Sequence, residues 1–185
     1  GTLTDALAAI NHHVFAERTV TMDELLAALA DNFDGCDELR RTLATASPAW
    51  GNDDDRADEI AVRIFESYFA AVDGRPNTRG GRYRVNLLPT TVHIYFGRVT
   101  GALPNGRVAG ETVSEGISPT QGADILGPTA VMRSAAKIDH ARTGGTLLNM
   151  KFNPGVFAGE GTDKFAALIR GYFRMGGHHV QFNVN

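Results

Sequence analysis

The chain contains one cysteine, Cys36, and its neighbours suggest a reactive thiol. Gly35 precedes the cysteine, and the carboxylates of Asp37 and Glu38 follow it. A single cysteine excludes an internal disulfide, and it excludes a thiolate-rich zinc or iron–sulfur site built from this chain alone. Cys36 is therefore either a reactive centre that works without a second cysteine or an ordinary residue in a suggestive setting.

Two histidine pairs and one run of carboxylates are candidate metal-binding sites. His12-His13 and His178-His179 are adjacent in sequence, but neighbours on a helix or strand point in different directions and do not easily share a metal. Residues 53–55 are all aspartate, yet the remaining ligand spacing of a calcium loop is missing. We expect no metal site, and we expect the aspartates to cap the helix that follows.

Two further stretches resemble catalytic motifs. Asp139-His140 could be a base with its orienting carboxylate, but no serine or cysteine is tied to it by spacing. A histidine near the C-terminal dipole of a helix is favoured instead. Residues 101–110 read GALPNGRVAG, and they lack the Gly-Lys-Ser/Thr ending of a phosphate-binding loop. This segment is interpreted as a structural turn.

The elements that carry these residues differ between the two parts of the chain. Only three of the 21 glycines precede residue 74, which favours helices before it and strands, turns and shorter helices after it. Apolar spacing predicts a helix over residues 3–15. The capping box of Thr21 and Glu24 opens a second helix, a third follows Gly35 until Pro48 stops it, and a longer helix runs to Val72.

The second part is predicted to form a parallel sheet. Residues 83–96 are rich in β-branched and aromatic residues and are predicted to be a strand, with Pro89 at its start or at a bulge. A helix near 129–138, a strand near 146–152, a helix near 162–174 and a strand near 179–184 complete an alternating order. Because the chain stops inside this last strand, we expect it to be a fragment of a larger protein.

Charge and hydropathy narrow the class of partner. The net charge of -3 and the pI near 6.1 give no reason to expect nucleic-acid binding, which depends on clustered Lys and Arg. No apolar run approaches a membrane span, and the N-terminus lacks the order of a signal peptide. A cytoplasmic location is expected.

The Gly-rich half resembles a known family. It reads VNLLPTTVHIYFGRVTGALPNGRVAGETVSEGISPTQGAD, then GPTAVMRSAAKIDHARTGGTLLNMKF, then GHHVQFNV. These motifs are similar to the C-terminal part of the catalytic domain in glycyl radical enzymes of the pyruvate formate-lyase superfamily, and most similar to its dehydratase and lyase branch. Leu103 and Asn105 depart from the usual T-P-D-G-R motif, and Met150 replaces the glutamine of N-Q-K-F.

The resemblance implies a fold and a set of partners. The fold class would be α/β: residues 1–73 would pack as helices outside a barrel, and residues 74–185 would supply some of its strands and helices. The parent would be a homodimer acting on a small-molecule substrate. A radical S-adenosylmethionine activating enzyme with an iron–sulfur cluster would install the glycyl radical, and this segment would bind no cofactor itself.

The resemblance also places the chemistry. The thiyl cysteine and the radical glycine are expected outside this chain, so no catalytic residue is assigned within it, and Cys36 belongs to a peripheral helix–turn–helix. Substrate-facing groups are predicted at Thr91 and His93, or at Thr90 if Pro89 shifts the strand register by one. Arg107 and Glu115 are expected to make structural pairs.

The reaction is predicted at the level of the branch. Residues 85–97 look most like dehydratases of the hydroxyproline type, so the parent is expected to be a carbon–oxygen lyase that begins by thiyl-radical hydrogen abstraction. A carbon–nitrogen or carbon–sulfur lyase of the choline or isethionate type, or a formate C-acetyltransferase-like member, is the alternative. A second alternative is an inactive truncated domain.

Overall fold

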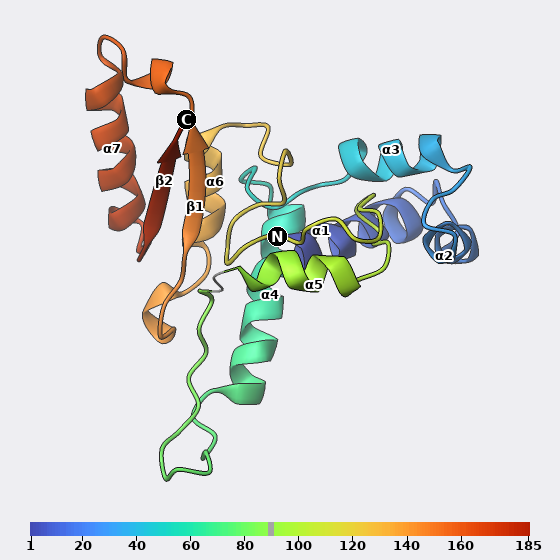
Figure 1. Ribbon diagram of the computed structural model, residues 1–185, viewed down its shortest axis with the longest axis horizontal. Helices are drawn as coiled ribbons and strands as arrows, with labels where there is room; N and C mark the ends of the chain where they lie inside the picture. The colour runs from blue at the N-terminus through green and yellow to red at the C-terminus, as the bar shows by residue number, and fades with distance from the viewer. Residues whose placement is uncertain (89–90) are drawn as a thin grey trace.

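The computed structural model describes residues 1–88 and 91–185 (Figure 1). The strands with α6 and α7 form one arm, α2 and α3 form another, and α4 extends from the centre away from both. Among the described residues, no helix is both long and apolar enough to cross a membrane.

The helices predicted for the first part are confirmed. They are α1 (Thr2–Ala9), which continues as a π-helical segment (Ile10–Ala16), α2 (Met22–Ala30), α3 (Asp37–Ala46) and α4 (Asp55–Val72). The capping box at α2 is present, because the Thr21 hydroxyl accepts from the Glu24 N–H and the Glu24 carboxylate accepts from the Thr21 N–H at 2.8 Å. Asp54 caps α4 by accepting from the Arg56 N–H.

The second part contains α5 (Val92–Val99), α6 (Pro128–Ala136), β1 (Leu148–Phe152), α7 (Gly161–Arg174) and β2 (Val180–Val184). Two short 3-10 helices, His140–Arg142 and Pro154–Phe157, flank β1. The predicted strands near 146–152 and 179–184 are confirmed, and so are the helices near 129–138 and 162–174. The strands pair in parallel, from Leu148 opposite Val180 to Phe152 opposite Val184.

The strand predicted over residues 83–96 is wrong. Of its described residues, Leu87 forms an isolated parallel bridge with Thr146, and residues 92–99 form α5 instead. The physical reason is that Val92, Phe96 and Val99 also fit one helical face, so β-branched composition did not decide between the two periods. Pro89 and Thr90 lie outside the described residues.

Hydrophobic clusters stabilise the arms, and a small third cluster of Ala8, Ala57 and Ile60 packs α1 against α4. One of the two larger clusters joins α4, α6, β1 and α7, and it buries Trp50, Phe65, Met132, Leu148 and Tyr172 almost completely. The other joins α2 and α3, and includes Leu25, Phe33 and Leu43. Since β1 presents alternate residues to the first cluster, its opposite face is left for polar groups.

Candidate functional site

A cavity of about 890 Å³ lies against one face of the two paired strands. Residues from the segment 113–128 and His93 of α5 also line it. Period two directs Asn149 and Lys151 of β1 toward it, and Gln181 and Asn183 stand beside them in the register of β2. The Asn149 N–H donates to the Ser118 hydroxyl at 2.9 Å. The buried Asn149 Oδ1 has no hydrogen-bond partner among the described residues. The sheet therefore gives the cavity an amide-rich wall.

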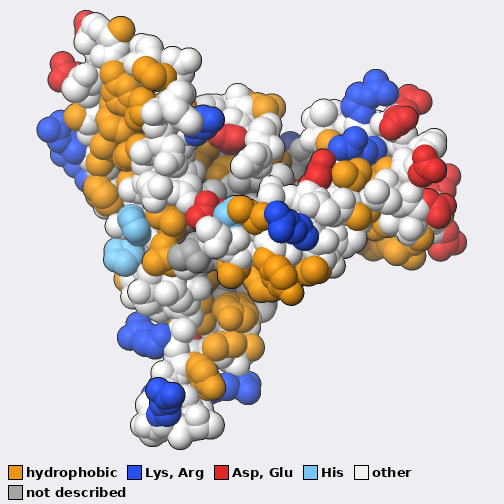
Figure 2. Space-filling model, in the orientation of Figure 1, with side chains coloured by type: hydrophobic (Ala, Val, Ile, Leu, Met, Phe, Trp, Pro, Cys, Tyr) orange, Lys and Arg blue, Asp and Glu red, His pale blue; other side chains and the backbone are white. Residues whose placement is uncertain are grey.

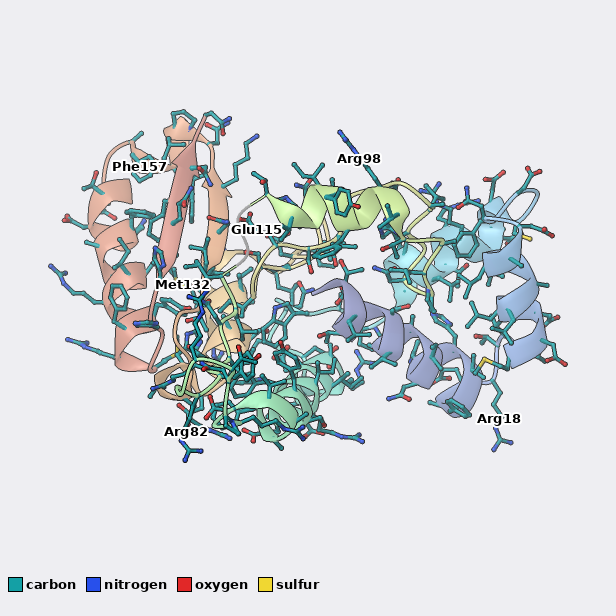
Figure 3. All side chains as sticks on the ribbon, turned by 60° about the horizontal axis from the view of Figure 1, so that its bottom comes forward. Arg18, Arg82, Arg98, Glu115, Met132 and Phe157 are labelled. Atoms are coloured by element: carbon teal, nitrogen blue, oxygen red, sulfur yellow. The ribbon has the colours of Figure 1, made fainter. Side chains whose placement is uncertain are left out.

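The segment that contains Glu115 forms an adjoining wall, hydrogen-bonded to the start of β1. Gly116 has φ +54°, and a Cβ there would stand 2.5 Å from the Leu147 carbonyl oxygen, so only glycine fits this approach. Ile117 donates its N–H to the Leu147 carbonyl at 3.1 Å and accepts from the Trp50 indole at 2.7 Å. These contacts fix the backbone beside Glu115, which Figure 3 shows near the start of α5.

The structure separates the residues predicted to face the substrate. His93 is half-buried and lines the cavity, and its carbonyl accepts from the Val113 N–H at 3.4 Å. Thr91 is the exposed N-cap residue of α5 and does not line this cavity, because residues two apart on a helix do not share a face. Thr90 lies outside the described residues. A role of these residues in substrate binding stays a prediction.

Sequence reasoning missed the polar residues of the sheet. Asn149 with Lys151, and Gln181 with Asn183, follow the period of two within correctly predicted strands. This alternation was a usable signal for the polar face. Glu115 had no comparable signal, since the contacts that place it come from Leu147 and Trp50.

Asp139 and His140 do not form a catalytic pair. The His140 ring contacts the Thr146 hydroxyl through Nδ1 and the Ala135 carbonyl, near the end of α6, through Nε2, both at 2.8 Å. Asp139 instead accepts from the Ala141 N–H at 3.1 Å. Burial lowers the pKa of His140. The expected position at a helix end is confirmed.

The predicted helix cap is confirmed at Asp54, and the other two aspartates of the run form ion pairs. Asp54 caps α4, while Asp53 and Asp55 bind the Lys137 ammonium at 3.1 and 2.7 Å. The fully buried Asp58 also binds Lys137, at 2.7 Å. Within residues 1–88 and 91–185, no group of three or more His, Cys, Asp or Glu side chains has the geometry of a metal site.

Cys36 is the half-buried N-cap residue of α3, where it packs against the α2–α3 cluster. Figure 1 shows α2 and α3 on the arm away from the sheet. The predicted position at a helix start is confirmed. Arg107 binds backbone carbonyls, including that of Gly101 at 2.7 Å, and so makes structural contacts.

Comparison with known proteins places this geometry in a family. The protein family described as "Pyruvate formate lyase-like" matches residues 1–97, and the family described as "Glycine radical" matches residues 113–185. The cavity combines His93 from the first region with Glu115 and both strands from the second.

Three relatives show the extent of the similarity. Trans-4-hydroxy-L-proline dehydratase of Clostridioides difficile is 55% identical over 185 residues, which is all of this chain and 23% of that protein. The crystal structure of hydroxyproline dehydratase from the same organism, with trans-4-hydroxy-L-proline bound, superposes with a TM-score of 0.97 at 54% identity, covering 100% of this chain and 24% of the other. The glycerol-bound B12-independent glycerol dehydratase of Clostridium butyricum has a TM-score of 0.94 at 39% identity, with the same coverage.

The chain therefore spans about a quarter of the length of the relatives it matches. The two matched regions account for most of its residues, and the fold of the whole chain agrees with the corresponding part of the two dehydratase structures. The chain belongs to the pyruvate formate lyase-like family of glycyl radical enzymes.

Proposed function

We propose that the chain is part of a cytoplasmic glycyl radical dehydratase whose substrate is trans-4-hydroxy-L-proline or a similarly small hydroxylated molecule. The observation that carries the proposal is 54% identity with a TM-score of 0.97 to a dehydratase structure with that substrate bound. A shared fold alone would not support the assignment of a substrate. Sequence identity of 54% over the whole chain favours the same class of reaction as in that dehydratase.

In this proposal the chain contributes part of an α/β barrel. Residues 1–73 pack outside the barrel, and residues 74–185 supply strands and helices to its wall. The parallel pairing of β1 and β2, continued by the parallel bridge between Leu87 and Thr146, supports a larger parallel sheet. Both strands turn their apolar sides toward helices, as a barrel wall requires.

The chemistry begins at groups that we place outside this chain. A thiyl radical takes a hydrogen atom from the substrate, and the substrate radical then loses hydroxide together with a proton, which leave as water. The product radical takes the hydrogen atom back from the thiol, which regenerates the thiyl radical. An activating enzyme that uses S-adenosylmethionine and an iron–sulfur cluster installs the glycyl radical in a homodimeric parent. Exclusion of water by the enclosed barrel protects the radical intermediate.

The contribution of this chain to substrate binding is assigned first to His93. Its half-buried position on the cavity that Glu115 also lines supports this assignment. An imidazole and a carboxylate can hold hydroxyl and ammonium groups of a small substrate. Thr91, at the exposed N-terminus of α5, and Thr90 are secondary candidates.

The test is anaerobic activation of the full-length enzyme. The glycyl radical is measured by electron paramagnetic resonance, and turnover is then measured with trans-4-hydroxy-L-proline, glycerol, 1,2-propanediol, choline and isethionate. We expect a radical signal, with hydroxyproline as the preferred substrate. Turnover of choline or isethionate alone would replace the dehydratase assignment with the lyase alternative, and a protein that forms no radical would contradict both.

A further inference from the structure

Helix α5 is attached to the protein through its backbone. Gly97 is its only buried residue, and large apolar side chains elsewhere on the helix are exposed. The helix instead lies along residues 110–113: the Val113 N–H reaches the His93 carbonyl at 3.4 Å, and the Gly110 N–H reaches the Thr100 carbonyl at 3.4 Å. Among the described residues of this chain, side-chain packing therefore does little to fix the position of this helix.

Arg107 supplies the strongest polar contacts at the C-terminal end of α5. Its side chain is buried, and Nη2 donates to the Gly97 carbonyl at 2.6 Å while Nη1 donates to the Gly101 carbonyl at 2.7 Å. The Thr100 carbonyl lies 3.4 Å from Nη1, and the Glu111 carbonyl also accepts from Nη2. One guanidinium thus joins the end of the helix to the segment beside it.

The chemistry of this end of the helix suits a guanidinium. The last carbonyls of a helix have no partner within it, and they carry the negative end of the helix dipole. Arginine presents donors in a rigid plane that can reach several carbonyls at once, whereas the ammonium of lysine donates from a single point. Lysine at position 107 would keep the charge but could not bridge Gly97, Gly101 and Glu111.

Gly97 allows α5 to lie directly against residues 111–112. A Cβ on this residue would overlap the Glu111 carbonyl oxygen and would stand 2.6 Å from the Thr112 Cα. The absence of a side chain brings the helix close enough to residues 111–112 for the guanidinium to reach both segments. Substitution of Gly97 would therefore move α5 without touching Arg107.

We propose that Arg107 is a positioning residue which, by binding the C-terminal carbonyls of α5, holds His93 at the wall of the cavity. The role rests on the proposed function, because it matters to turnover only if His93 faces the substrate. A shift of about 1 Å in such a group can lower a rate by roughly 100-fold even when the chemistry lies elsewhere.

The proposal is tested in the full-length enzyme with Arg107→Lys, Arg107→Ala and Gly97→Ala, and with Arg98→Gln as the matched control. Arg98 lies on the same helix, and Figure 3 shows it directed away from the molecule. We expect Arg107→Lys and Gly97→Ala to keep the wild-type glycyl radical yield and to lose on the order of 100-fold in kcat/KM. Added guanidinium should restore part of the turnover of Arg107→Ala and none of that of Gly97→Ala. Arg98→Gln should resemble wild type.

Hydrogen exchange separates positioning from a general loss of structure. In Arg107→Lys, faster amide exchange should be confined to α5 and residues 108–113. Wild-type kcat/KM in Arg107→Lys would overturn the proposal, as would faster exchange throughout the enzyme or a parallel loss of radical. If the wild-type enzyme turned over none of the substrates, the proposed function would fail. Amide exchange of α5 in Arg107→Lys would then test whether Arg107 holds this helix: faster exchange supports that role and unchanged exchange overturns it.

Discussion

Cys36 shows how a suggestive residue can have an ordinary position. Its thiol is the N-cap of α3 but makes no capping hydrogen bond. We predict that Cys36→Ser leaves turnover of the complete enzyme unchanged and raises the free energy of unfolding by about 0.5 kcal/mol, because a serine hydroxyl can accept from the first-turn N–H groups. Steady-state kinetics and chemical denaturation measure the two effects. Cys36→Ala is the control for the hydroxyl, and loss of all activity in either variant would contradict the placement of Cys36.

His140 links stability to pH. Burial lowers its pKa below the ordinary value of 6.5, so the folded protein keeps the imidazole neutral where the unfolded chain binds a proton. The unfolded state then holds more protons, and stability falls as the pH drops below about 6.5, by at most about 1.4 kcal/mol per pH unit. Thermal unfolding between pH 5 and 7 should show a flatter pH dependence in His140→Gln than in wild type. Equal slopes in both proteins would exclude His140 as the cause.

Single residues were predictable where their partners are close in sequence. The Thr21–Glu24 capping box and the aspartate that caps α4 depend on neighbours within three positions, and both were expected. The position of Glu115 depends on Leu147 and Trp50, and the role of Arg107 depends on the end of α5. Such distant partners leave no local pattern, which is why sequence reasoning could not place these two side chains.

At the scale of elements, α6 is attached to α4 by an ion pair between a partly exposed lysine and a fully buried carboxylate. Lys137, at the end of α6, binds the fully buried Asp58 at 2.7 Å, and Ser134 donates to the same carboxylate at 2.9 Å. We predict that Lys137→Met lowers the free energy of unfolding by about 3 kcal/mol, because it leaves the buried carboxylate without its counter-ion. Chemical denaturation measures the loss.

Two comparisons test this interpretation of the α4–α6 contact. Arg133→Met removes a largely exposed partner of Asp53 and should cost no more than about 1 kcal/mol. Lys137→Met combined with Asp58→Asn should recover part of the loss, since no buried charge is then left unpaired. A double variant as unstable as the sum of its single variants would show that the two side chains are not coupled.

Elements were predicted well where one periodicity dominated. The amphipathic pattern of α7 and the alternation of β1 and β2 gave their bounds within one or two residues. Residues 92–99 fit a strand by composition and a helix by spacing, and the backbone contacts with Arg107 and residues 110–113 lie outside that window. The change from α to π geometry at Ile10 has no counterpart in the side-chain pattern.

At the scale of the whole molecule, α5 carries one of the patches of exposed apolar surface. Figure 2 shows hydrophobic side chains gathered on this helix and along α4. The exposed members on α5 are Val92, Ile94, Tyr95, Phe96 and Val99. Contiguous apolar surface usually marks a contact with another protein segment. Since the relatives are about four times as long as this chain, we infer that a full-length protein of this family covers this surface with residues outside the 185 described by the sequence.

Lysine substitutions on the exposed face of α5 should have opposite effects in the 185-residue chain and in the full-length enzyme. Replacing Tyr95 and Val99, which are 64% and 67% exposed in this chain, by lysine should reduce self-association of the 185-residue chain in size-exclusion chromatography. In the full-length enzyme the same change should lower the free energy of unfolding by about 2 kcal/mol per side chain, because each would lose its apolar burial. Ile125→Lys with Leu126→Lys is the control, as these exposed apolar residues lie in a loop outside α5. If the unmodified chain stays monomeric at high concentration and binds no apolar dye, the surface of α5 needs no cover, and the proposed contact with the rest of the enzyme is wrong.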